Sequence, residues 1–203
     1  MNLLNNVTTA ILATAAIALM ETPADAGKDI HINVQLAETC VHNVCTDIGD
    51  DNLKAVQEYY AEHNIHLNFI KSEIHYQEDA VITMEGEING NAGLLGTMFW
   101  INRQMPRVNE EIDIRWMNIR LNGLDGRLLG VGASMTKSMI TNSLISNYED
   151  QSIVQYVIKH ELGHVMCLPH TEKKENLMRD TLHFDDGDKL TGSQIKTIRK
   201  CFR

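Results

Sequence analysis

Hydrophobic and polar residues alternate along several short stretches of the chain, as they do in β-strands that bury one face. Residues 29–36 and 112–121 alternate in this way, and residues 65–70 and 80–88 are also strand-like. Residues 128–140 contain two further short strand candidates. The Gly- and Asn-rich residues 89–93 are typical of a turn. The pattern predicts a domain built around a β-sheet.

Three other segments have the periodicity of helices. The first starts at Asp50 or Asp51, either of which can act as the N-cap, and runs to about His63. The second runs from Asp150 through a stripe of apolar residues, which places Gln155 and Lys159 on the opposite, solvated side. The third is short and covers about residues 192–201. Strands and helices in this order predict an α/β or α+β fold with a mixed sheet.

Length and charge narrow the possible functions. A chain of 203 residues is long enough for one domain with a hydrophobic core. Its formal net charge of −9 argues against a nucleic-acid or anionic-membrane partner, because such partners require clustered Lys and Arg. We expect a monomeric domain that spans residues 27–203.

The first 26 residues resemble an export signal. Residues 7–20 form an apolar stretch that is too short to span a bilayer comfortably, and Ala24 and Ala26 suit a signal-peptidase site. The first six residues contain no Lys or Arg, which departs from the usual pattern. We expect a signal peptide over residues 1–26, a secreted or periplasmic protein, and no membrane attachment after cleavage. An uncleaved N-terminal anchor is the alternative.

The chain has four cysteines, an even number that suggests two disulfides in an exported protein. Three pairings are possible, and free buried cysteines are a further alternative. We favour a local Cys40–Cys45 bridge together with Cys167–Cys201, which would tie the C-terminal tail to the segment described next.

Residues 160–170, HELGHVMCLPH, contain a set of metal-ligand side chains. His160 and His164 are four residues apart, so on a helix both imidazoles lie on one face and can reach one zinc ion. Pro169 ends the helix, which lets the chain turn and bring His170 to the same ion. Three protein ligands leave a fourth position open, as in catalytic rather than structural zinc sites.

Glu161 lies next to the first histidine but is not in register to bind the metal itself. Its carboxylate can take a proton from a zinc-activated water and pass it to a leaving amine. We therefore expect Glu161 to be the general base of a zinc-dependent hydrolase.

These motifs resemble those of the metzincin metallopeptidases. HELGHVMCLPH is similar to the HExxHxxGxxH zinc signature, and Asn176-Leu177-Met178 resembles the Met-turn beneath the zinc. Residues 128–133 resemble the edge strand along which metzincins bind substrate, and residues 190–196 resemble the final helix of matrixins. No Tyr follows two residues after Met178, which favours the matrixin-like side.

The resemblance implies a twisted mixed sheet with an antiparallel edge strand, an active-site helix and a C-terminal helix. It also implies one catalytic zinc ion, endopeptidase activity and a polypeptide substrate. In one respect this sequence departs from the family pattern, because Cys167 stands where the family has glycine. A bridge to Cys201 could hold the tight turn there; otherwise the turn differs and His170 is not a ligand.

Other interpretations remain at this point. A zinc-binding effector or inhibitor module without turnover is the rival function, and Glu172 and Glu175 are poorly spaced as alternative third ligands. Residues 185–188, Asp-Asp-Gly-Asp, contain oxygen ligands that suit Ca²⁺, although an acidic turn explains them better. Cys40 could bind zinc as a latency switch, but we favour the local disulfide.

Overall fold

A computed structural model describes residues 28–41, 44–76, 112–119, 129–142, 145, 148–180 and 187–202. In these residues six strands form one sheet. The strands are β1 (Ile30–Val41), β2 (Val44–Cys45), β3 (Ile65–Tyr76), β4 (Ile112–Ile119), β5 (Gly130–Ala133) and β6 (Ser138–Asn142). The predicted strand at 80–88, the turn at 89–93 and the signal peptide at 1–26 lie outside the described residues.

The sheet is mostly parallel. Strand β1 pairs in parallel with β3 on one side and with β4 on the other, and β4 pairs in parallel with β6. The short strand β5 is antiparallel to β6 and ends the order of strands, whereas β2 pairs antiparallel with the end of β1. The structure thus confirms the predicted mixed sheet with an antiparallel edge strand. Strands β1 and β3 have 12 residues each, longer than their sequence patterns indicate.

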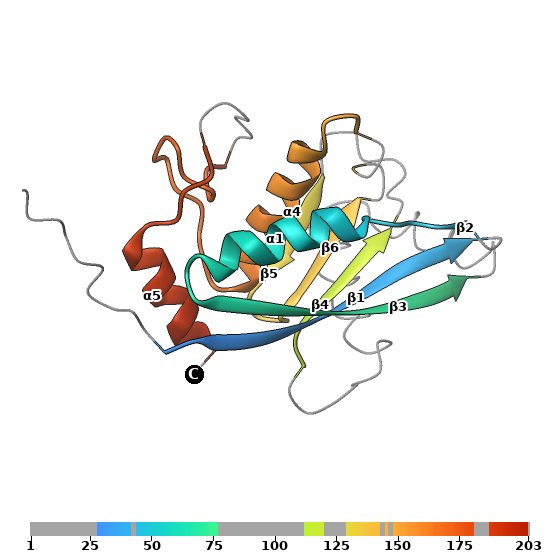
Figure 1. Ribbon diagram of the computed structural model, residues 1–203, viewed down its shortest axis with the longest axis horizontal. Helices are drawn as coiled ribbons and strands as arrows, with labels where there is room; N and C mark the ends of the chain where they lie inside the picture. The colour runs from blue at the N-terminus through green and yellow to red at the C-terminus, as the bar shows by residue number, and fades with distance from the viewer. Residues whose placement is uncertain are drawn as a thin grey trace, which may run out of the picture.

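Helices α1 (Asp50–Ala61) and α4 (Gln151–Val165) cover one face of this twisted sheet, and helix α5 (Gly192–Cys201) closes one end (Figure 1). Helix α4 begins where the sequence pattern placed its start, and Asp150 is its N-cap, with a side chain that accepts a hydrogen bond from the Ser152 backbone N–H. Helix α1 differs from the prediction. Its N-cap is Gly49, and the two aspartates lie in the first turn, where their charge is favourable to the helix dipole.

The core lies between the sheet and these helices. Alternate residues of the strands point into it, and residues one turn apart on α1 and α4 meet them. Its largest fully buried side chains include Trp116 and Tyr60, and the Trp116 indole donates a 2.8 Å hydrogen bond to the Thr141 hydroxyl. Packing in this core fixes the position of α4 on the sheet. This position matters because α4 carries the HExxH segment.

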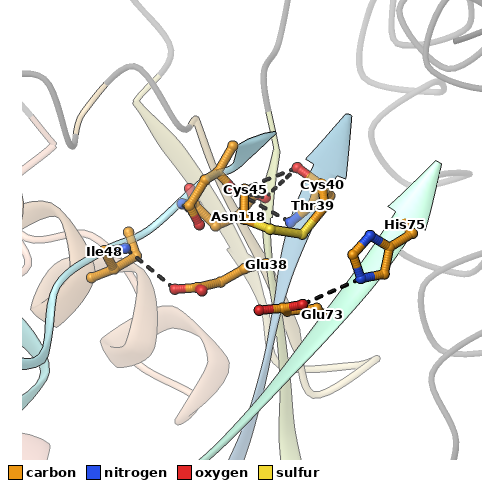
Figure 2. The surroundings of a disulfide bond; sticks show 9 residues. Glu38, Thr39, Cys40, Cys45, Ile48, Glu73, His75 and Asn118 are labelled. Atoms are coloured by element: carbon orange, nitrogen blue, oxygen red, sulfur yellow. Dashed lines mark hydrogen bonds and ion pairs between the residues drawn. A yellow bond between two sulfur atoms is a disulfide. The ribbon is translucent and has the colours of Figure 1, made fainter. Parts of the chain in front are cut away.

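Two disulfides involve all four cysteines. Cys40 and Cys45 join β1 to β2 at directly paired positions (Figure 2). Cys167 and Cys201 join the turn after α4 to the end of α5. Both favoured pairings are confirmed, and Cys40 therefore offers no free thiolate for a latency switch. Among the described helices, none has the length and apolar character needed to cross a membrane.

Candidate metal centre

The structure brings three imidazole nitrogens together at one point. The Nε2 atoms of His160 and His164 lie 3.1 Å apart, and the Nε2 atom of His170 lies 3.3 Å and 2.9 Å from them. Two nitrogen ligands at zinc bond lengths in a tetrahedral arrangement are about 3.3 Å apart. The three side chains therefore fit one zinc ion, with His160 buried and His170 exposed.

Backbone carbonyls hold the other ring nitrogens. His160 Nδ1 lies 2.7 Å from the Leu177 carbonyl oxygen, and His164 Nδ1 lies 2.9 Å from the Leu168 carbonyl oxygen. A carbonyl can only accept, so Nδ1 carries the proton in both rings and Nε2 presents a lone pair. Lone pairs that face one another at 3.1 Å repel, and a bound cation relieves that repulsion. This is the usual environment of a metal-binding histidine.

Burial keeps these ligands neutral. The pKa of His160 is lowered to about 4, chiefly by burial; the Leu177 carbonyl opposes this lowering, and the two neighbouring imidazoles add to it. Burial also lowers the pKa of His164. Because a metal binds only the unprotonated nitrogen, both rings are ready to coordinate near neutral pH.

The turn after α4 places the third histidine. Cys167 has a φ of 73°, in the left-handed region that favours glycine. The Cys167 and Leu168 backbone N–H groups donate to the carbonyls of His164 and Gly163, which closes the turn at the helix end. The cysteine at the family's glycine position thus adopts a glycine-like conformation, and the disulfide to Cys201 ties it down.

Glu161 lies on the same helix, 9% exposed, beside strand β5. The pKa of its carboxyl is raised to about 8 because burial outweighs a hydrogen bond from the Gly132 backbone N–H, which acts to lower it. A nearby dication would favour the ionised form. The carboxyl is thus held in place next to the three imidazoles in surroundings that favour accepting a proton once a cation is present.

Glycines in β5 allow the strand to approach the helix closely. A Cβ on Gly130 would lie 2.6 Å from Glu161 Cγ, and a Cβ on Gly132 would lie 2.2 Å from the Glu161 carbonyl oxygen. Between β5 and α4 opens a cleft of about 450 Å³. Its walls are formed by the edge strand and the residue before it, by α4 with two of the histidines and Glu161, by His170 and by the residues after the Met-turn: Leu129, Gly130, Val131, Gly132, Val157, His160, Glu161, His164, His170, Arg179 and Asp180.

The segment that resembles a Met-turn lies beneath the histidines. Leu177 and Met178 are fully buried, and the Met178 sulfur packs against Gly163 of α4. The Asn176 side chain accepts a 3.0 Å hydrogen bond from the Met178 backbone N–H, which shapes the turn. The amides of Asn176 and Gln194 pair reciprocally at 2.9 and 3.0 Å, so the first turn of α5 supports this segment.

The structure corrects one sequence prediction and adds two residues. Gln155 and Lys159 are partly buried against other elements: Gln155 donates a hydrogen bond to Asn52 of α1, and Lys159, with 13% of its side chain exposed, pairs with Asp188. The segment at 187–189 folds back over α4, which the helix pattern alone cannot reveal. Sequence patterns also missed Tyr156 and Gln194, both of which contact the Met-turn segment.

Two other candidate metal clusters carry less weight. In the acidic turn, Asp188 is engaged by Lys159, and Asp185 and Asp186 lie outside the described residues, so calcium binding stays a prediction. Cys40, Glu73 and His75 also lie close together (Figure 2). There the sulfur is held in the disulfide and Glu73 pairs with His75 at 3.2 Å, which leaves no thiolate for a metal.

Comparisons with known proteins concern the family and the fold of the chain. The family model for matrixins matches residues 23–203. Similar solved structures include an archaemetzincin from Methanopyrus kandleri (17% identity, TM-score 0.54, 84% of this chain and 95% of that one). A zinc-dependent peptidase from Methanocorpusculum labreanum is also similar (14% identity, TM-score 0.51, 82% and 99%).

Metalloproteinase-II from Bacteroides fragilis is a third similar structure (12% identity, TM-score 0.54, 88% of this chain and 55% of that one). At these identities the likeness concerns the fold. No curated protein sequence gives a significant match. The fold expected from the sequence, a twisted mixed sheet with helices packed on it, is the fold that these structures share with the chain.

Proposed function

The chain belongs to the matrixin family, and on that premise we propose that it is a secreted zinc-dependent endopeptidase. In this proposal His160, His164 and His170 hold one zinc ion, and Glu161 is the general base. The observation that carries the proposal is the convergence of three Nε2 atoms within 2.9–3.3 Å of one another, two of them with their tautomers set by backbone carbonyls.

When bound at these nitrogens, zinc supplies a Lewis acid that polarises the scissile carbonyl and makes water more acidic. Glu161 takes a proton from the attacking water and passes it to the nitrogen of the leaving amine. The Gly132 N–H hydrogen bond orients the Glu161 carboxylate for both transfers. Burial beside Gly130 keeps other water away from the carboxylate, which strengthens its interactions.

Strand β5 offers a place for an extended polypeptide. Among the described strands it pairs with β6 alone, and its residues line the cleft next to Glu161. A peptide that adds to this edge gains backbone hydrogen bonds that do not depend on its sequence. This supports cleavage inside a chain, because neither end of the peptide is needed for such binding.

The first experiment compares wild type with Glu161→Ala. We expect purified wild type to contain one zinc per chain and to cleave an internally quenched peptide with blocked ends, and a chelator to abolish cleavage. Glu161→Ala should retain the zinc and lose at least about a hundredfold in kcat, the usual contribution of a general base. Equal rates for the two proteins would contradict the assigned role of Glu161.

Secretion rests on residues 1–26 and is tested separately. We expect the protein recovered outside the cytoplasm to begin at Gly27, which N-terminal sequencing measures directly. A mature chain that still begins with the apolar stretch would support an anchor.

The alternative function is a zinc-binding effector or inhibitor module, and Cys167 at the family's glycine position is the feature that favours it. Turnover discriminates between the two. A protein that holds one zinc but cleaves neither a peptide library nor unfolded proteins would favour the binding module.

A further inference from the structure

The backbone carbonyl of Leu177 accepts hydrogen bonds from two side chains of the same helix. His160 Nδ1 lies 2.7 Å from this oxygen, and the Tyr156 hydroxyl donates to it at 3.1 Å. Tyr156 precedes His160 by one helical turn, so both side chains leave α4 on the same face. Their rings stack, with centroids 6.2 Å apart and an interplanar angle of 22°.

The position of Leu177 is not set by regular secondary structure. Its segment has only isolated bridges, between Thr171 and Arg179 and between Asn176 and Lys189. Helix α4, by contrast, packs against the sheet. Tyr156 is buried in that packing, with 7% of its surface exposed. The Tyr156 hydroxyl therefore connects a rigid element to the carbonyl that a metal ligand depends on.

We propose that Tyr156 is a positioning residue for the zinc ligand His160. By holding the Leu177 carbonyl, it keeps the proton of His160 on Nδ1 and the plane of the ring aimed at the metal. Groups that hydrogen-bond directly to a metal ligand typically contribute a factor of about 10 to 100 in metal affinity, and we expect Tyr156, which acts through the Leu177 carbonyl, to contribute about tenfold. The inference rests on the proposed function only in that the metal is zinc.

A simpler interpretation is that Tyr156 only fills the core, and the chain contains a matched control for it. Tyr60 of α1 is also buried, at 0% exposed, and its hydroxyl donates at 2.7 Å to the backbone carbonyl of Lys159. That carbonyl belongs to α4 next to His160, but it is not one of the carbonyls that face the Nδ1 atoms of His160 and His164, which are those of Leu177 and Leu168. Tyr60→Phe therefore removes a comparable buried hydrogen bond near the site without touching the partner of His160.

The experiment measures zinc affinity by competition with a chromophoric chelator for wild type, Tyr156→Phe and Tyr60→Phe. Phenylalanine keeps the ring and its stacking, so Tyr156→Phe removes the hydroxyl alone. We expect Tyr156→Phe to weaken zinc binding about tenfold or more and Tyr60→Phe to leave it within about twofold of wild type. Unchanged affinity in Tyr156→Phe, or an equal loss in Tyr60→Phe, would overturn the proposal.

A second readout uses the metal-free protein. Long-range ¹H–¹⁵N correlation spectra distinguish the two tautomers of a histidine ring. We expect His160 to be protonated on Nδ1 in wild type and Tyr60→Phe, and to populate a mixture of tautomers in Tyr156→Phe. The same single tautomer in all three proteins would count against the inference.

Failure of this inference and failure of the proposed function give different results. A wild-type protein that binds zinc but cleaves no peptide contradicts the peptidase, while the affinity and tautomer comparison still decides the role of Tyr156. A peptidase whose zinc affinity is indifferent to Tyr156→Phe contradicts the positioning role alone.

Discussion

Gly163 and Met178 lie so close together that no side chain fits between them, since a Cβ on Gly163 would be 2.3 Å from the Met178 sulfur. Gly163 lies in the last turn of α4, and within a helix glycine lowers stability by up to roughly 1 kcal/mol relative to alanine. The close approach gives a reason for this residue. Because Gly163 has no side chain, the Met-turn segment can pack close to α4, near enough for the Leu177 carbonyl to accept a hydrogen bond from His160.

Gly163→Ala should therefore destabilise the protein although it improves helix propensity. Overpacking of this kind costs about 1 to 3 kcal/mol, which exceeds the gain from alanine. We expect a lower free energy of unfolding in denaturant and weaker zinc binding, because Met178 and its turn must move. Gly192→Ala is the control: nothing lies within 4 Å of a Cβ there, so it should leave zinc binding unchanged. A free energy of unfolding equal to that of wild type in Gly163→Ala would mean that the Met-turn segment can move away without cost.

The turn at Cys167 can be tested with two double variants that both lack the second disulfide. Removing a bridge between residues 34 apart costs about 4 kcal/mol in the chain-entropy account. Cys167→Gly with Cys201→Ser should be about 1 kcal/mol more stable than Cys167→Ser with Cys201→Ser, because glycine adopts a φ of 73° without strain. We expect the glycine form also to bind zinc more tightly, as chelator competition would measure. Equal stability and affinity would show that this residue does not govern the position of His170.

Gly130→Ala should impair the general base Glu161 without affecting zinc binding by the histidines. The new methyl group would meet Glu161 Cγ at 2.6 Å and push the carboxyl from its place, whereas no histidine atom is among the nearest neighbours of that position. We expect kcat to fall at least about tenfold, because proton transfer depends on the exact position of the base, while zinc content stays at one per chain. Loss of zinc together with activity would contradict the separation.

Metal-free protein should lose stability as the pH rises, through Glu161. Burial raises the pKa of this carboxyl from 4.5 to about 8. Between these values the unfolded chain has lost a proton that the folded protein keeps, so the free energy of unfolding falls with rising pH. Glu161→Gln removes this titration and should be more stable than wild type by a few kcal/mol at pH 8, on the order expected for such a shift. Below pH 4.5 the difference should largely vanish.

Denaturant unfolding of the two chelator-treated proteins from pH 4.5 to 8.5 measures this difference. Titration of His160 and His164 occurs in both proteins, so its contribution cancels when they are subtracted. A stability difference that is the same at every pH would contradict the buried, protonated state of Glu161.

Much of the site follows from local sequence. The four-residue spacing of His160 and His164 needs only a helix, and the apolar stripe of α4 predicts that helix independently of the motif. Pro169 predicts that the helix ends before His170, and in the structure the turn that brings His170 back is made at Cys167. The mixed sheet and both disulfide pairings are also confirmed.

The remaining features depend on residues distant in sequence. The close approach of Gly130 to Glu161 requires β5 to lie at the sheet edge against α4, which strand order alone decides. The helix pattern predicts that Lys159 is solvated, but in the structure the distant residue Asp188 folds back and pairs with it. Tyr156 fits an ordinary apolar face, and only the position of the Leu177 carbonyl shows that its hydroxyl has a partner.

The disulfide between Cys167 and Cys201 closes the chain segment between these residues into a covalent ring. The third histidine and the whole Met-turn segment lie inside that ring, whereas the HExxH helix lies just outside it. A single backbone cut anywhere between the two cysteines, including one made by another copy of the same peptidase, would therefore release no fragment. Such nicked molecules should migrate as intact chains on a denaturing gel until a thiol reductant opens the ring, so a preparation can conceal this damage.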